Sequence, residues 1–306
     1  MTRVDIYRQT LRHFLGPIQP LLDHPDVTEV MVIGPDRVYF EARGRVQKSE
    51  LRFPDEAALL AAATNVAEYV GRPIGPAEPT LDARLPDGSR VHVILPPAAR
   101  QGVCMTIRRF LKASFSLPVL VNSGTLSQQA VDLLSTAVRL RKSILISGGT
   151  GTGKTSFLNA LSASVPEHER IIVIEDSSEL QLSQPHTVYL EAQPADDDGQ
   201  GELTIRDLFV NALRMRPDRI IVGEVRRGEA LDLVQSMMSG HPGSLATIHA
   251  NDPLTALLRL ELLSRMNTVP LPADVARSQV ALAIDLVVQL ERREKDRRVT
   301  AVSEVV

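Results

Sequence analysis

The 306-residue sequence contains a single cysteine, Cys104, no tryptophan and only 4% aromatic residues. One cysteine excludes a disulfide bond within the chain and a four-cysteine zinc site. It fits a reduced, cytoplasmic setting. Scarce aromatic residues and a formal net charge of −3 give no basis for the stacking platforms and basic channels of nucleic-acid-binding proteins. We therefore expect no direct contact with nucleic acid.

Long hydrophobic runs are also missing. The N-terminal segment MTRVDIYRQT is charged and no apolar run follows it, so it does not resemble a signal peptide. No stretch approaches the ~18 apolar residues of a membrane-spanning helix, so any membrane association is expected to be peripheral. The hydrophobic fraction of 43% and charged fraction of 23% are typical of globular proteins. The chain exceeds the length of one compact core, which predicts two domains.

Residues 1–112 are predicted to form a small α+β domain. An amphipathic pattern over residues 3–22 predicts a helix, which Gly16-Pro17 is expected to break or kink. A second helix is expected from Pro54 to Tyr69, with the proline at the favoured first position. Short alternating segments between turn residues predict antiparallel strands. These segments are TEVMVI, RVYFEA, RVQKSELRF, SRVHVILPP and VCMTIRRF.

Residues 123–306 show a different pattern, and residues 113–122 are the predicted linker. The apolar runs SILIS, RIIVIE, TVYLE, RIIVGE and SLATIH alternate with helical segments. Such alternation predicts an α/β domain with a mostly parallel sheet covered on both faces. The expected helices cover residues 126–140, with Ser127 as the cap, and 155–164, 205–215, 227–239, 253–266 and 273–283. IDLVVQLER and RRVTAVSEV are expected to close the chain as a hairpin.

The stretch SILISGGTGTGKTSFL predicts a phosphate-binding loop. Gly148, Gly153, Lys154 and Thr155 match G-x-x-x-x-G-K-[ST], between a predicted strand and a predicted helix. The glycines let backbone N–H groups face phosphate oxygens, Lys154 is expected to reach the β- and γ-phosphates, and Thr155 to coordinate Mg²⁺. A purely structural glycine-rich turn is the alternative. The expected nucleotide-binding residues are Gly148, Gly149, Thr150, Gly151, Thr152, Gly153, Lys154, Thr155 and Ser156.

Three predicted strands end on polar residues. Glu175 ends RIIVIE, Glu224 ends RIIVGE, and His249 ends SLATIH. Because parallel strands end at one edge, where the loop also lies, these side chains are expected to converge. Glu175 is the candidate general base. Glu224 is the candidate metal-binding acid, acting directly or through water, and His249 is the candidate γ-phosphate sensor. The alternatives are solvated or paired glutamates and a histidine that satisfies only local hydrogen bonds.

Arginine is dense in the same region, and its guanidinium is suited to stabilising phosphate charge in a transition state. Solvated helix faces and carboxylate pairing explain most such residues, so we expect few to be catalytic and select Arg226. His241, in SGHPGS, is a further candidate and is equally consistent with a structural loop residue. The arginines concerned are Arg206, Arg214, Arg216, Arg219, Arg226 and Arg227.

With these segments placed, the sequence resembles the type II/type IV secretion ATPase superfamily. The segments that carry the resemblance are GGTGTGKT, VIEDSSEL, LTIRDLFVNALRMRPDRIIVGEVRRGEALDL and SGHPGSLATIHAND, in the family's order and approximate spacing. The resemblance begins near Pro25. The core is most similar to ATPases of tight-adherence pilus assembly, whereas FLGPIQPLLDHPDVTEVMV resembles conjugative-transfer ATPases.

The resemblance implies a RecA-like P-loop core behind a smaller N-terminal domain, assembled as a hexameric ring with ATP between the two domains. It implies that Glu175 is the catalytic glutamate and Glu224 the Walker B acid, with His241 and His249 as a histidine pair. Basic residues of the N-terminal domain close over the phosphates in this family. The matching positions are Arg90 and Arg108, with Arg84 and Arg109 as weaker candidates.

The resulting hypothesis is a cytoplasmic hexameric ATPase, peripheral to the inner membrane. It would hydrolyse ATP, with Mg²⁺, to power pilus assembly or protein secretion through inner-membrane platform proteins, with a hinge near residues 112–122. The alternatives are a conjugative DNA-transfer ATPase, a RecA-like nucleic-acid motor such as a helicase, and a nucleotide-gated scaffold without hydrolysis.

Overall fold

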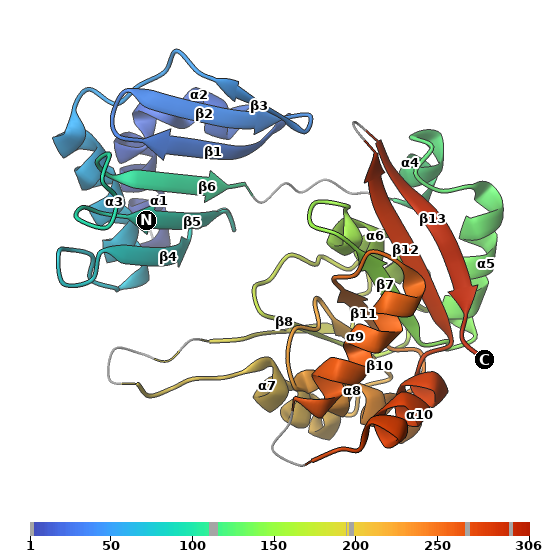
Figure 1. The fold of residues 1–306 in the computed structure, drawn as a ribbon. Coiled ribbons are helices and arrows are strands. Elements are labelled where there is room, and N and C mark those ends of the chain that lie inside the picture. Colours follow the sequence, from blue (N-terminus) through green and yellow to red (C-terminus); the bar gives the residue numbers. More distant parts are fainter. Residues whose placement is uncertain (1–2, 110–115, 194, 196–198, 267–269, 294–295) are drawn as a thin grey trace. The chain divides into compact units, whose positions relative to one another are not determined.

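The computed structural model describes residues 3–109, 116–193, 195, 199–266, 270–293 and 296–306. The chain divides into two compact units, Met1–Ala113 and Ser114–Val306. Figure 1 shows an all-antiparallel sheet in the first unit and a larger, helix-covered sheet in the second.

The first unit is a six-stranded sheet in the order β3-β2-β1-β6-β5-β4. All neighbouring strands pair antiparallel. Buried residues of α3, including Leu59 and Val66, pack with Val30 and Met105 of the sheet to form its core. The elements are α1 Arg3–Phe14, α2 Gln19–Asp23, β1 Val27–Ile33, β2 Arg37–Ala42, β3 Arg45–Lys48, α3 Glu56–Val70, β4 Thr80–Arg84, β5 Arg90–Ile94 and β6 Cys104–Arg108.

Two helices of this unit bear on the sequence predictions. The helix expected over residues 3–22 is divided by a 3-10 turn, Gly16–Ile18, which confirms the predicted break. The expected start at Pro54 is wrong, because α3 begins at Glu56. The side chain of Asp55 accepts a hydrogen bond from the backbone N–H of Ala58, so Asp55 is the N-cap and Pro54 precedes it.

The second unit has a seven-stranded sheet in the order β13-β12-β7-β11-β10-β8-β9. Every pair is parallel except β12–β13, which confirms the predicted mostly parallel sheet and the C-terminal hairpin. Strands β7 and β8 are buried along their whole length. The strands are β7 Ile144–Gly148, β8 Ile171–Glu175, β9 Thr187–Glu191, β10 Arg219–Val222, β11 Leu245–Ile248, β12 Leu286–Arg293 and β13 Asp296–Glu304.

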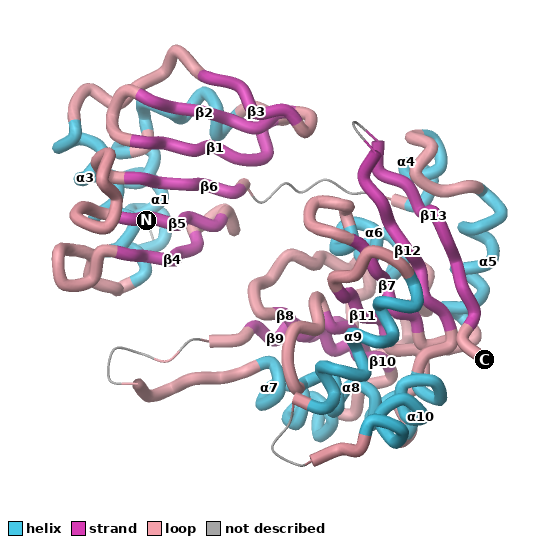
Figure 2. Tube along the Cα trace, in the orientation of Figure 1, coloured by secondary structure: helices cyan, strands magenta, loops and turns pink. Residues whose placement is uncertain are grey.

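Helices cover both faces of this sheet (Figure 2). Leu145 and its neighbours on one face pack with α7 to α10, while Ile144 and Ile146 on the other pack with α4 to α6. Apolar side chains on both faces explain why the strands read as continuous hydrophobic runs. The helices are α4 Leu117–Asn122, α5 Gln128–Arg139, α6 Lys154–Ser162, α7 Ile205–Ala212, α8 Glu229–Met238, α9 Pro253–Arg265 and α10 Ala273–Ala283.

The predicted linker differs from the structure. Residues 113–115 lie outside the described residues, as does part of the expected hinge at 112–122. Helix α4 occupies Leu117–Asn122, and its Leu120 is buried in the core of the second unit. In the ranges given above, no helix combines the length and the apolar character needed to span a lipid bilayer.

Candidate nucleotide-binding site

The phosphate-binding loop connects β7 to α6, as the motif predicts. Gly148 is the last residue of β7 and Lys154 the first of α6. A Cβ atom on Gly148 would lie 2.5 Å from Oγ1 of Thr152, which donates a hydrogen bond to the carbonyl of Gly149. Gly153 has a φ of 90°, which side chains disfavour. The tight loop therefore requires glycine at the motif positions.

Lys154 is buried inside this loop. Its Nζ donates hydrogen bonds to the carbonyls of Gly148 and Gly149, both at 3.0 Å, and lies 3.4 Å from Nδ1 of His249. Burial lowers the pKa of Lys154 because it disfavours the charged form. A partly desolvated ammonium within a glycine-rich loop fits a negatively charged phosphate chain.

Glu224, after β10, and His249, after β11, lie together next to Lys154. Nε2 of His249 is 2.6 Å from Oε1 of Glu224. The pKa of His249 is lowered, first by burial and then by the positive charge of Lys154. The imidazole thus lies between the lysine of the loop and the acid of a neighbouring strand end.

Arg226 extends this cluster to a third strand. Its Nε donates to Oε2 of Glu224 at 2.7 Å, and its Nη1 pairs with Asp176, the residue after β8. The chain of contacts Lys154–His249–Glu224–Arg226–Asp176 therefore joins the loop to the ends of β11, β10 and β8. His249 and Glu224 meet as strand direction predicts, whereas at the end of β8 it is Asp176, and not Glu175, that joins this chain of contacts.

Glu175 ends β8 and is 3% exposed. Its Oε1 accepts hydrogen bonds from the backbone N–H groups of Glu179 at 2.8 Å and Leu180 at 3.0 Å. Burial outweighs these hydrogen bonds and raises the pKa of Glu175 to about 7. A carboxyl group with this pKa exchanges a proton near neutral pH, as a general base requires.

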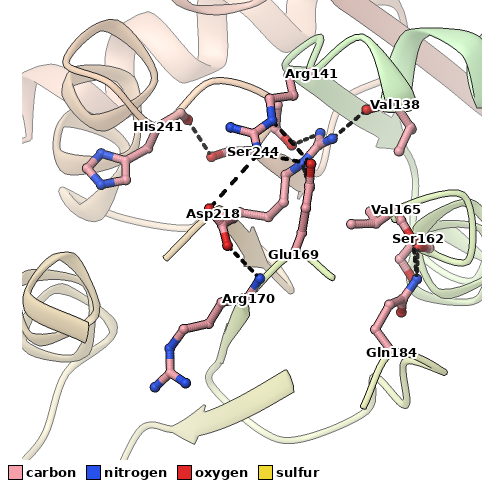
Figure 3. Close-up of polar contacts among 12 residues, drawn as sticks. Val138, Arg141, Ser162, Val165, Glu169, Arg170, Gln184, Asp218, His241 and Ser244 are labelled. Carbon is pink, nitrogen blue, oxygen red and sulfur yellow. Dashed lines mark hydrogen bonds and ion pairs between the residues drawn. The ribbon is translucent and has the colours of Figure 1, made fainter. Parts of the chain in front are cut away.

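The structure does not bring His241 together with these residues. His241 precedes β11, whereas His249 follows it, so the two histidines lie at opposite ends of one strand. In Figure 3 His241 lies near Ser244, whose Oγ donates to its carbonyl at 3.1 Å. The four residues of β11 lie between His241 and His249, so they separate the pair that the family resemblance implies.

A buried ion pair lies where β8 and β10 begin, in the region of His241 (Figure 3). Nε of the fully buried Arg219 donates to Oε2 of Glu169 at 2.5 Å. The other guanidinium nitrogens of Arg219 donate to the carbonyls of Gly243 at 3.0 Å and Val138 at 2.7 Å. Arg219 therefore has a structural role that joins β10 to α5 and to the turn before β11.

Arg90 and Arg108 belong to the first unit. They face each other in the register of β5 and β6, and Arg84 faces Arg90 in β4. Directly opposed residues of antiparallel strands share a face, so the three arginines form a row on one face. Arg109 differs, because its Nη1 donates to the backbone carbonyls of Val27 and His24.

Two residues near the loop were missed from the sequence. Arg297 of β13 donates from Nε to the carbonyl of Gly151 at 3.1 Å. Nη1 of Arg292 in β12 lies 3.4 Å from the position that a Cβ atom on Gly151 would take. The hairpin was predicted, but its pairing with β7 has no local sequence signal.

Thr155 and Glu224 are the residues predicted to hold Mg²⁺. Thr155 lies in the first turn of α6, half-buried, and Glu224 follows β10, which β11 separates from β7 in the sheet. Within the described part of the chain, no three His, Cys, Asp or Glu side chains gather closely enough to hold a metal ion by themselves. Mg²⁺ prefers oxygen ligands and binds through one or two protein groups, waters and substrate phosphates, and the hydroxyl of Thr155 and the carboxylate of Glu224 are oxygen ligands of this kind.

Comparison with known proteins supports this description. The family described as type II/IV secretion system protein matches residues 13–302. A protein of Mycobacterium tuberculosis, provisionally named a conjugal transfer protein, is 37% identical over 289 residues, covering 92% of this chain and 82% of that protein. The type IV secretion system protein PtlH of Bordetella pertussis is 34% identical, covering 91% of this chain and 89% of that protein.

Solved structures show the same fold. The VirB11 ATPase of the Brucella suis type IV secretion system is 28% identical, with a TM-score of 0.52, and the match covers 98% of this chain and 96% of that chain. The pilus retraction motor PilT, solved with bound ADP, is 17% identical with a TM-score of 0.62, covering 92% of this chain and 77% of that chain.

Proposed function

The chain belongs to the type II/IV secretion system protein family, and from this membership we propose that it is a P-loop ATPase that powers a secretion or pilus machine. The observation that carries the proposal is the chain of contacts from Lys154 through His249 and Glu224 to Arg226. It joins the phosphate loop to the acidic strand ends, as hydrolysis beside a bound nucleotide requires. The VirB11 ATPase in the comparison favours ATP as the nucleotide.

Each side chain has a proposed role at this site. The loop from Gly148 to Ser156 binds the phosphates, and Lys154 exchanges its carbonyl partners for phosphate oxygens. Glu175, with its raised pKa, accepts the proton of the attacking water. Thr155 and Glu224 would hold Mg²⁺, which neutralises phosphate charge when bound. His249, which lies beside Lys154 and Glu224, senses the γ-phosphate in this proposal.

The assembly is a further part of the proposal. We propose a homohexameric ring, peripheral to the inner membrane and in contact with its platform proteins, in which Arg90 and Arg108 contribute to phosphate binding. Their support is the shared row in β5 and β6 together with the family resemblance. Charge reversal at either arginine is expected to weaken ATP binding, and unchanged binding in both variants would remove them from the site.

A conjugative DNA-transfer system is the second candidate setting. The relative from M. tuberculosis, provisionally named for conjugal transfer, favours it, and PtlH favours a type IV secretion system. ATPase stimulation by single-stranded DNA would point to a nucleic-acid motor, whereas we expect none because the net charge is −3.

The decisive experiment measures mass by light scattering, with and without a non-hydrolysable ATP analogue, alongside ATPase turnover at several protein concentrations. We expect a hexamer whose specific activity rises with assembly. An active monomer at every concentration would contradict the ring, and ATP binding without turnover would contradict the enzyme and favour a nucleotide-gated scaffold.

A further inference from the structure

The β12–β13 hairpin runs beside the phosphate loop. Strand β12 pairs in parallel with β7 as far as Leu290 opposite Gly148, the first glycine of the motif. The following residues of β12 therefore continue past the end of β7, alongside the loop. In β13, Arg297 lies opposite Arg292, and directly opposed residues of antiparallel strands share a face.

Both arginines contact the loop or lie close to it. Nε of Arg297 donates to the carbonyl of Gly151 at 3.1 Å, and its Cδ is 3.3 Å from the position of a Cβ atom on Gly153. Nη1 of Arg292 is 3.4 Å from the corresponding position on Gly151. Side chains at these two glycines would meet the arginines, so the hairpin is packed against the loop.

The strand order indicates which end of a nucleotide this hairpin would meet. Glu175 ends β8, and Glu224 and His249 follow β10 and β11. These three strands lie on one side of β7, while β12 lies on the other side. The γ-phosphate must face the acids for hydrolysis. A phosphate chain lying along the loop then directs the nucleoside toward the hairpin.

Base recognition needs a group outside the loop, because the loop's backbone N–H groups and Lys154 bind phosphates. An arginine guanidinium is planar and stacks on aromatic rings, and such contacts also form at exposed sites. Arg292 is exposed and lies on the hairpin face that carries Arg297. It is therefore the side chain with the position and the chemistry to cover a purine base.

We propose that Arg292 binds the nucleoside part of the nucleotide by stacking its guanidinium on the base, while Arg297 holds the loop against the hairpin. This inference rests on the proposed ATPase function and deepens it. It assigns nucleotide affinity to the C-terminal hairpin in addition to the phosphate loop.

The test compares two ligands, Mg-ATP and Mg-tripolyphosphate, by isothermal titration calorimetry on the full chain. Arg292→Ala is expected to raise the Kd for ATP about fivefold, since a cation–π contact of a guanidinium contributes about 0.5–2 kcal/mol and 1.4 kcal/mol is tenfold. The Kd for tripolyphosphate, which has no base, is expected to change less than about twofold. Arg292→Lys keeps the charge without the plane and is expected to behave like Arg292→Ala.

Arg293→Ala is the matched control. Arg293 is the next residue of the same strand, points to the opposite face and pairs with Glu291 at 3.2 Å. The Arg293→Ala substitution removes the same charge at the adjacent position of β12, and it is expected to leave both dissociation constants unchanged. Arg297→Ala is expected to raise the Kd for both ligands, because the substitution removes the hydrogen bond to the carbonyl of Gly151.

Three outcomes would overturn the inference. Equal weakening of ATP and tripolyphosphate in Arg292→Ala would mean that Arg292 acts on the phosphates through its charge. Unchanged ATP binding would mean no contact, and full affinity in Arg292→Lys would exclude stacking. A wild-type chain that binds ATP without hydrolysing it would contradict only the proposed function, whereas one that binds no ATP would contradict both.

Discussion

The backbone of Gly223 lies directly against the side chain of Glu175: a Cβ atom on Gly223 would be 2.8 Å from Cγ of Glu175. The two residues follow or end neighbouring strands, β10 and β8. The missing side chain at Gly223 leaves room for the glutamate to turn toward the backbone N–H groups of Glu179 and Leu180. The glycine before Glu224 therefore has a function in placing the candidate base.

Gly223→Ala is expected to displace Glu175 and to reduce kcat about 100-fold, because a misplacement of about 1 Å can cost that much. The Kd for ATP is expected to stay unchanged, since Gly223 lies outside the loop. Steady-state kinetics and nucleotide titration check the two values. Gly75→Ala is the control, because nothing lies within 4 Å of a Cβ atom there. Full activity in Gly223→Ala would show that Glu175 has room to move.

The pKa of about 7 at Glu175 predicts a pH dependence of hydrolysis. A general base acts only when deprotonated, so kcat is expected to rise with pH, reach half its maximum near pH 7 and level off above pH 8. The measurement is kcat at saturating ATP between pH 5.5 and 9. A rate constant independent of pH in this range would remove Glu175 as the base.

The same pKa predicts a stability change in Glu175→Gln. Because burial raises the pKa from 4.5 to about 7, the folded chain holds this proton more tightly than the unfolded chain. The wild-type free energy of unfolding therefore falls as pH rises from about 4.5 to 7. The variant lacks this loss and is expected to be more stable at pH 8, by at most about 3 kcal/mol, with little difference at pH 4. It should also bind ATP and barely turn it over.

Urea unfolding at pH 4 and pH 8 tests the stability difference, and nucleotide titration with an ATPase assay tests the function. A variant that is less stable at both pH values would show that the carboxylate hydrogen bonds outweigh burial. Turnover at the wild-type rate would remove Glu175 from catalysis.

The sequence predicted the parts of the site that depend on local pattern or strand direction. The loop motif has fixed spacing, and the ends of β8, β10 and β11 share an edge because parallel strands do. The pairing of His241 with His249 was predicted from the family resemblance, although the strand segment SLATI lies between the two histidines in the sequence. Arg292 was missed because the partner of a strand depends on long-range pairing, which periodicity does not report.

Competing local signals explain the other differences. Pro54 is suited to the first turn of a helix, but Asp55 next to it caps better because its carboxylate accepts the N–H of Ala58. In the predicted linker, Leu117–Asn122 is helical because Leu120 packs into the core of the second unit. The cap at Asp55 is a local signal that competes with Pro54, whereas the packing of Leu120 involves segments far apart in the sequence and is not visible in a short sequence window.

The buried pair Glu169–Arg219 is expected to be essential for stability. Glu169→Gln would leave the fully buried guanidinium of Arg219 without its counter-charge, and breaking such a pair costs about 3–5 kcal/mol. Glu167→Gln, two residues away and exposed, is the control and is expected to change stability by less than about 0.5 kcal/mol. Urea unfolding of both variants gives the comparison, and equal stabilities would contradict the role assigned to Arg219.

The buried ammonium of Lys154 is expected to lower the free energy of unfolding of the nucleotide-free chain, although it increases the affinity for ATP. Burial lowers its pKa, so the folded chain without nucleotide disfavours the ammonium form. Lys154→Met keeps the length of the side chain and removes the charge. It is expected to unfold at the same or a higher urea concentration than the wild-type chain, yet to bind ATP about 100-fold more weakly, because hydrogen bonds to charged groups contribute about 1.5–3 kcal/mol.

Lys142→Met is the control, because it removes the same charge outside the loop and should leave ATP binding intact. Lys142 is an exposed lysine before β7 that pairs with Asp285 at 2.7 Å. A Lys154→Met variant that loses stability together with affinity would mean that the carbonyls of Gly148 and Gly149 depend on the ammonium, and that the loop is not held in shape by its glycines alone.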